Sequence, residues 1–145
     1  MRYAGACHCG AIRVGFETDR PLAPRACCCS FCRKHGARTV SDREGAATID
    51  CAVPPILYRF ASHSTDYVLC PRCGIYVGAV AGPPEARIAT LNLNAFDDPR
   101  LDLAAAPVSY EGETDDAKAQ RRRERWTPVR VQGPGPAALR SDRSS

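Results

Sequence analysis

The sequence lacks a long apolar run: no segment approaches the roughly 20 consecutive apolar residues that a membrane-spanning helix requires. It also lacks an apolar signal segment, because Met1-Arg2-Tyr3 leads almost directly into the first cysteine cluster. We therefore expect a soluble, cytoplasmic protein with no membrane partner.

Lysine is scarce as well, since only two of the 20 basic residues are lysines and the rest are arginines. The net charge of +4 is unevenly divided, with residues 119–145 carrying +5 and the rest −1. The run Arg121–Arg125 is compatible with binding to nucleic acid or to an acidic protein. Acidic residues at Asp115 and Asp116 and arginines further on also complement the dipole of one helix, and this interpretation is favoured. Nucleic acid is therefore not an expected partner.

Cysteine, by contrast, is abundant. The chain has nine cysteines, an odd number, and three of them are adjacent in sequence, which argues against a disulfide scaffold. In a reducing compartment, clustered cysteines are more typical of metal binding. Seven of the nine form three clusters: Cys7 with Cys9, then Cys27, Cys29 and Cys32, then Cys70 with Cys73.

Two of these clusters have the form of a zinc knuckle, a tight turn that directs two thiolates at one ion. The C-x-x-C pair is followed by Gly74, and the C-x-C pair near the start is followed by Gly10, in positions where a turn needs glycine's conformational freedom. Each pair supplies half of a tetrahedral site. The predicted ligands of this closed structural zinc site are Cys7, Cys9, Cys70 and Cys73.

The third cluster has the different spacing C-x-C-x-x-C and supplies only three ligands, Cys27, Cys29 and Cys32. Three protein ligands with one open position are typical of a catalytic zinc. A fourth protein ligand, Cys28 or His35, would instead close the site and make it structural. Two zinc ions per chain are expected in either case.

At this point the sequence resembles a known family. Its ordered motifs are Gly5-Ala6-Cys7-His8-Cys9-Gly10-Ala11, Cys27-x-Cys29-Ser30-x-Cys32-Arg33-Lys34 and Cys70-Pro71-x-Cys73-Gly74. From about residue 3 to Asp97-Asp98-Pro99 they resemble the glutathione-dependent formaldehyde-activating enzyme family, which includes centromere protein V. The resemblance implies a small zinc-containing β-fold similar to a Rab-exchange-factor chaperone. It also implies a structural four-cysteine zinc and a catalytic three-cysteine zinc.

Charge explains how such a site can work. Zinc with three thiolates carries a net charge near −1, so it suits a soft thiolate ligand better than hydroxide. A coordinated thiolate can add to an aldehyde carbon, and the reverse step cleaves a carbon–sulfur bond. We therefore expect a zinc-dependent carbon–sulfur lyase that forms or cleaves an adduct such as S-hydroxymethylglutathione, with a glutathione-like thiol and an aldehyde as partners. The alternative is a non-enzymatic zinc-binding module for protein or nucleic-acid interaction.

Residues beside the third cluster are candidates for substrate contacts. Arg33 and Lys34 can receive the carboxylates of the thiol, and His35 can transfer a proton, unless all three form a solvated helix face. Cys28 is predicted to be a small buried residue rather than a ligand, and Cys51 to be structural.

The hydrophobic pattern predicts a mainly β domain. Strands are expected at residues 12–17, 67–69 and 75–80, and at 87–93 with alternate residues on one face. One helical turn is expected after Ser30, and a C-terminal helix at about 114–126. Residues 1–130 are expected to form one zinc domain, and the Gly-, Pro- and Ser-rich residues 131–145 a disordered tail.

Overall fold

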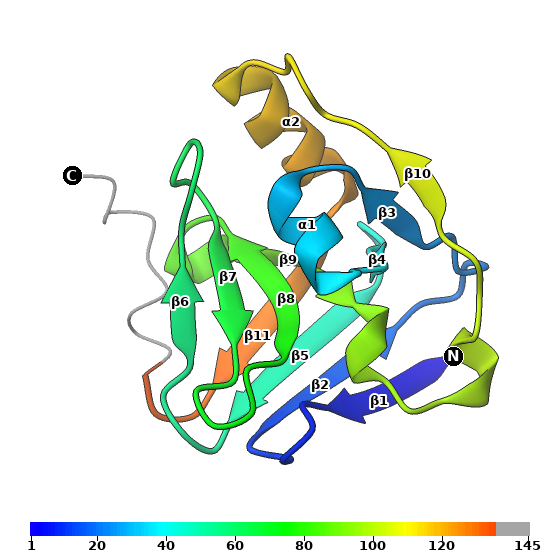
Figure 1. Cartoon of the computed structure of the whole chain (residues 1–145), viewed down its shortest axis with the longest axis vertical. Coiled ribbons are helices and arrows are strands. Elements are labelled where there is room, and N and C mark those ends of the chain that lie inside the picture. Colours follow the sequence, from blue (N-terminus) through cyan, green and yellow to red (C-terminus); the bar gives the residue numbers. More distant parts are fainter. Residues whose placement is uncertain (136–145) are drawn as a thin grey trace.

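Short strands joined by tight turns make up most of the chain (Figure 1), and the predicted mainly β class is confirmed. The computed structural model describes residues 1–135, so most of the tail predicted to be disordered lies outside the described residues. The strands are β1 (Arg2–Ala6), β2 (Ile12–Glu17), β3 (Arg25–Cys27), β4 (Thr39–Val40), β5 (Ala46–Cys51), β6 (Ile56–Tyr58), β7 (Asp66–Leu69), β8 (Tyr76–Ala81), β9 (Ile88–Asn92), β10 (Ala106–Val108) and β11 (Thr127–Gln132). The helices are α1 (Ser30–His35) and α2 (Asp115–Arg125), with short 3-10 turns η1 (Pro84–Ala86), η2 (Leu93–Ala95) and η3 (Pro99–Leu101). Neither α-helix of the described part is long and apolar enough to cross a membrane.

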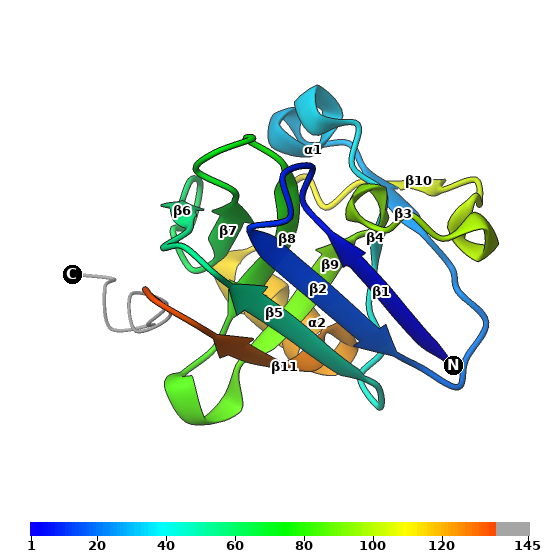
Figure 2. The same cartoon turned by 90° about the horizontal axis from the view of Figure 1, so that it is seen from below.

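The strands form one continuous hydrogen-bonded network with two lobes. One lobe has the order β1-β2-β5-β11, and Figure 2 shows these four strands side by side. The other lobe is built around β9. On one side of β9 the strand order is β4-β3-β10, and on its other side the order is β8-β7-β6. Strand β11 joins the lobes, because it pairs with both β5 and β9.

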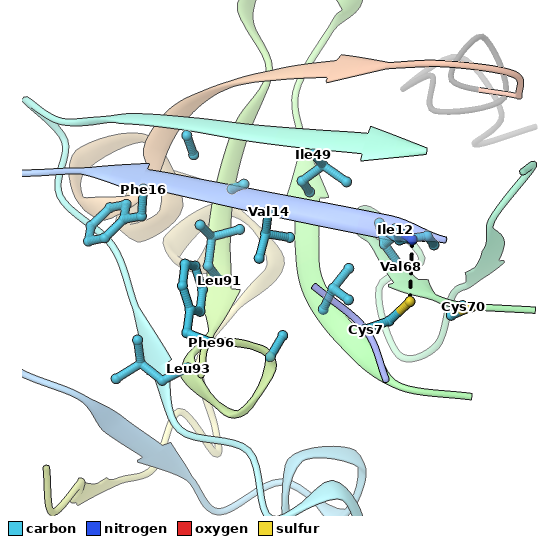
Figure 3. Packing of buried hydrophobic residues seen from close by; sticks show 14 of the residues in the cluster. Cys7, Ile12, Val14, Phe16, Ile49, Val68, Cys70, Leu91, Leu93 and Phe96 are labelled. Carbon is cyan, nitrogen blue, oxygen red and sulfur yellow. Dashed lines mark hydrogen bonds between the residues drawn. The ribbon is translucent and has the colours of Figure 1, made fainter. Parts of the chain in front are cut away.

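The main hydrophobic core lies between the two lobes. Strand β2 alternates buried and more exposed residues as expected, and it turns Ile12, Val14 and Phe16 inward. Figure 3 shows these side chains packed against Leu91 of β9 and Ile49 of β5. Burial of large apolar side chains contributes about 2 kcal/mol each, so this layer supplies much of the driving force for folding.

Strand β9 differs from its prediction, because all five of its residues are buried instead of alternate ones. Ala89 and Leu91 face the main core, as expected. On the opposite face, Ile88 packs with Trp126, the residue that ends α2. Because both faces of β9 are covered, its polar residues Thr90 and Asn92 are buried as well, and their side chains donate hydrogen bonds to the carbonyls of Val40 and Tyr76.

The predicted C-terminal helix is confirmed as α2. The Thr114 hydroxyl caps it by accepting a hydrogen bond from the backbone N–H of Ala117, at 3.1 Å. The chain then continues into β11, which runs parallel to β5 as far as Gln132. This strand passes the expected boundary at residue 130, because Val131 pairs with Ile49 of β5 and packs against the main core.

Candidate metal centres

Two hairpin tips bring the first and third cysteine clusters together. The sulfurs of Cys7, Cys9, Cys70 and Cys73 all lie within 4.8 Å of one another. The sulfurs of Cys7 and Cys9 are 3.8 Å apart, and those of Cys9 and Cys70 are 3.6 Å apart. A tetrahedral ion with metal–sulfur bonds of about 2.3 Å requires sulfurs about 3.8 Å apart, as in a zinc site. The four thiols therefore fit a closed metal site.

The two tips use their glycines in the same way, although the first turn is one residue shorter than the second. Gly10 and Gly74 adopt φ of +82° and +79°, a conformation that other residues rarely take. Their N–H groups donate hydrogen bonds to the carbonyls of Cys7 and Cys70, at 3.0 and 2.9 Å. The N–H of Ile12 donates to the Cys7 sulfur at 3.3 Å, as Figure 3 shows. These turns explain the glycine that follows each cysteine pair in the sequence.

The thiols of this site differ in acidity. Burial raises the pKa of Cys7 to about 11. For Cys73, burial opposes ionisation, but N–H donors from Ile75 and Cys9 and neighbouring thiols lower the pKa to about 6. Because metal binding must displace the remaining thiol protons, affinity for a metal rises with pH.

The second cluster forms where β3 passes into α1. Cys27 is the last residue of β3, and Cys29 caps the N-terminus of α1. The Cys29 sulfur accepts a hydrogen bond from the N–H of Cys32, at 3.4 Å, and the three sulfurs lie within 4.8 Å of one another. The local turn thus gathers all three predicted ligands on one side of the helix start.

One proton is shared unequally within this cluster. A hydrogen bond from the Cys32 thiol lowers the pKa of Cys27 to about 5. The same bond, together with burial, raises the pKa of Cys32 well above its ordinary value. Three thiolates this close together would repel one another, so they require a cation nearby. A bound metal ion supplies that positive charge. The donor set and spacing are consistent with zinc.

No fourth His, Cys, Asp or Glu of residues 1–135 joins the three sulfurs. Cys28 was expected to be buried, but it is exposed, and its N–H donates to the carbonyl of Val108 at 2.9 Å because β10 pairs with β3 here. His35 is also exposed, and its ring packs on Phe31 with centroids 4.5 Å apart. The cluster is left with three protein ligands. Cys51 is buried in the core, as predicted.

The three-cysteine cluster lies in the wall of a cavity of about 460 Å³, whereas the four-cysteine cluster does not. This volume is within the usual range for small-molecule sites. Most of the remaining wall is formed by the loop before β7, strands β7 and β8, the segment 109–113 and the region of helix α2. Their aromatic residues are Phe60, Tyr67, Tyr76, Tyr110 and Trp126.

The predicted substrate contacts Arg33, Lys34 and His35 do not line this cavity. All three are exposed, and the Arg33 side chain donates to the carbonyl of Cys28 at 3.2 Å. They form the solvated helix face that was the alternative. The cavity takes its basic side chains from elsewhere: Arg25, Lys118, Arg121 and Arg122.

Arg121 already has an internal partner. Two of its nitrogens donate to the Glu113 carboxylate at 3.0 and 3.1 Å, and its guanidinium lies 3.5 Å from the centroid of the Tyr110 ring. This arrangement lowers the pKa of Glu113, chiefly through the hydrogen bonds from Arg121. The pair fixes the segment before α2 against the cavity.

Fold and site together define a small β protein with two cysteine clusters able to hold metal ions, one closed and one opening on a cavity. Residues 2–110 match the family model described as glutathione-dependent formaldehyde-activating enzyme, and the chain belongs to this family. The structure is similar to a crystal structure of a Rhodobacter sphaeroides protein, with a TM-score of 0.57 and 28% sequence identity. That match covers 72% of this chain and 97% of the other. The family match ends before α2 begins.

Proposed function

We propose that the protein is a zinc-dependent carbon–sulfur lyase that forms or cleaves an aldehyde–thiol adduct such as S-hydroxymethylglutathione. One observation carries the proposal: the cluster with only three cysteines is the one that faces a cavity. Cys27, Cys29 and Cys32 are assigned as the ligands of the working zinc, and Cys7, Cys9, Cys70 and Cys73 as those of the structural zinc. A reaction that needs free thiols also agrees with the expected cytoplasmic location.

Zinc held by Cys27, Cys29 and Cys32 would lower the pKa of a thiol bound beside them and would keep the resulting thiolate nucleophilic. The substrate sulfur then attacks the aldehyde carbon and forms the carbon–sulfur bond. The carbonyl electron pair moves to oxygen, which takes up one proton, and the reverse sequence cleaves the adduct. The aromatic walls of the cavity limit the water that competes for the aldehyde.

Tyr67 is placed to assist at the oxygen. Its ring is held between Phe31 and Phe60, with both centroid distances 4.7 Å, and it lines the cavity beside the cluster. Burial raises the pKa of Tyr67 to about 12, so the phenol keeps its proton at neutral pH. A protonated phenol can donate a hydrogen bond to the oxygen on which negative charge develops.

We therefore expect Tyr67→Phe to lower the rate of adduct formation about ten- to a hundredfold, because one donor is lost while the ring packing stays. Tyr58→Phe is the matched control, since Tyr58 stacks on the same Phe31 but does not line the cavity. The exchange rate of each variant measures the effect on activity, and its melting temperature shows whether the fold is intact. Equal rates for the two variants would remove Tyr67 from the mechanism.

The activity itself is tested by mixing the protein with formaldehyde and glutathione and measuring exchange with the adduct by magnetisation-transfer NMR. We expect zinc-loaded protein to accelerate exchange in proportion to its concentration. Because the addition also proceeds unaided, protein stripped of zinc by a chelator is the control. Equal rates with and without zinc would favour the alternative, a non-enzymatic zinc-binding module.

A further inference from the structure

Arg122 of α2 is a buried cation in the cavity wall. Its residue surface is only 8% exposed, and one guanidinium nitrogen donates to the Ser64 hydroxyl at 2.9 Å. The guanidinium also lies 5.1 Å from the centroid of the Trp126 ring. Its Nε is buried and has no hydrogen-bond partner within residues 1–135.

No carboxylate of residues 1–135 forms an ion pair with this cation. Glu113 is near enough to interact electrostatically with Arg122, but its two oxygens are held by Arg121. Burying a charge without a partner is costly, and such groups are usually paired when the site is in use. Arg122 therefore has the capacity to bind an anion.

A second unsatisfied group lies in the same wall. Thr65 is 3% exposed, and its hydroxyl has no partner among the described residues. Thr65 and Arg122 both line the cavity, and Ser64, the neighbour of Thr65, contacts Arg122 directly. Buried donors without partners are rare in folded proteins, so two in one wall indicate a missing acceptor.

The cavity wall combines the three thiols with basic side chains. Cys27, Cys29 and Cys32 line it, and α2 contributes three of its four basic residues, Lys118, Arg121 and Arg122. Tyr67 lines the same cavity, and its phenol is near enough to interact electrostatically with both Arg122 and the three thiols. A molecule bound at the cluster can therefore extend toward Arg122 within one cavity.

We propose that Arg122 and Thr65 form an anion-binding subsite that receives a carboxylate of the thiol substrate while its sulfur lies at the three-cysteine cluster. A guanidinium donates a planar pair of N–H groups that matches a carboxylate, and the Thr65 hydroxyl adds one more donor. This inference rests on the proposed function for the position of the sulfur. The subsite depends on α2, which lies beyond the family match of residues 2–110, so it sets the thiol specificity of this chain.

Calorimetric titration of the zinc-loaded protein tests the subsite with three probes: glutathione, its diethyl ester and S-methylglutathione. The ester keeps the thiol and loses the carboxylates, whereas S-methylglutathione keeps the carboxylates and has no free thiol. We expect Arg122→Gln and Thr65→Val each to lower the affinity for glutathione and for S-methylglutathione about tenfold. The affinity for the ester should stay unchanged. Thr65→Val removes a hydroxyl that has no partner within residues 1–135, so it tests the subsite without breaking a hydrogen bond of the described fold.

Arg123→Gln is the matched control, because Arg123 is exposed on the same helix, and it should leave all three affinities unchanged. S-methylglutathione binding that depends on Arg122 supports the subsite even if the zinc chemistry fails. Glutathione binding that is insensitive to Arg122→Gln and Thr65→Val would overturn the subsite and leave the proposed function standing. The subsite would also be overturned if the variants lost affinity for glutathione and for the ester equally. The same holds if S-methylglutathione did not bind to the unmodified protein.

Discussion

Cys73→Ser should leave the protein insoluble or without fixed tertiary structure. Cys73 belongs to the four-cysteine site, which joins the turn after β1 to the turn after β7. Its partners Cys7 and Cys70 are 3% and 0% exposed and belong to the main core. Metal binding at such a site contributes on the order of 10 kcal/mol, comparable with the whole stability of a small domain. Circular dichroism and metal analysis would show loss of cooperative unfolding together with the metal.

Cys28→Ser is the matched control for this change, since Cys28 is exposed and belongs to neither cluster. It should leave the melting temperature and the metal content unchanged. A folded Cys73→Ser protein with an unaltered melting temperature would contradict the structural role of the first site.

Cys32→Ser should have a different effect: a folded protein that holds about one zinc ion per chain and has lost thiol–aldehyde activity. The three-cysteine cluster spans only residues 27 to 32, so little long-range order depends on it. Cys32 packs in a small group with Ala37 and Tyr76, apart from the main core. Metal analysis, circular dichroism and the NMR exchange assay on the same sample measure all three properties.

If Cys32→Ser collapses as completely as Cys73→Ser, the second site is structural too. The assignment of catalysis to it would then lose its main support. Retained exchange activity in a folded Cys32→Ser protein would equally contradict the assignment.

Features that depend on neighbouring residues could be predicted from the sequence. The cysteine spacing and the glycines at 10 and 74 indicated both clusters, because each turn is built from a few consecutive residues. Strands β7 and β8, which flank Cys70 and Cys73, could be predicted from their apolar pattern. Helix α2 followed from its acidic start and basic end.

Features that depend on distant contacts were missed. Strand β11 exists because it pairs with β5, some 80 residues earlier in the chain, and no local pattern signals this pairing. From the sequence, the run Arg121–Arg125 is interpreted as a basic helix end, with binding to nucleic acid or to an acidic protein as the alternative. Its spacing gives no sign that Arg121 and Arg122 line the same cavity as Cys27, Cys29 and Cys32. A buried arginine can be recognised only once the packing around it is known.

The central claim is that the metal at Cys27, Cys29 and Cys32 keeps one position for a substrate thiol. Cadmium NMR of the protein loaded with two cadmium ions tests this most directly, because the chemical shift of cadmium reports the number of sulfur ligands. We predict two signals of equal intensity, of which glutathione shifts only one, and that one is missing in Cys32→Ser. Two signals that glutathione leaves unchanged would show that both sites are closed and would contradict the account.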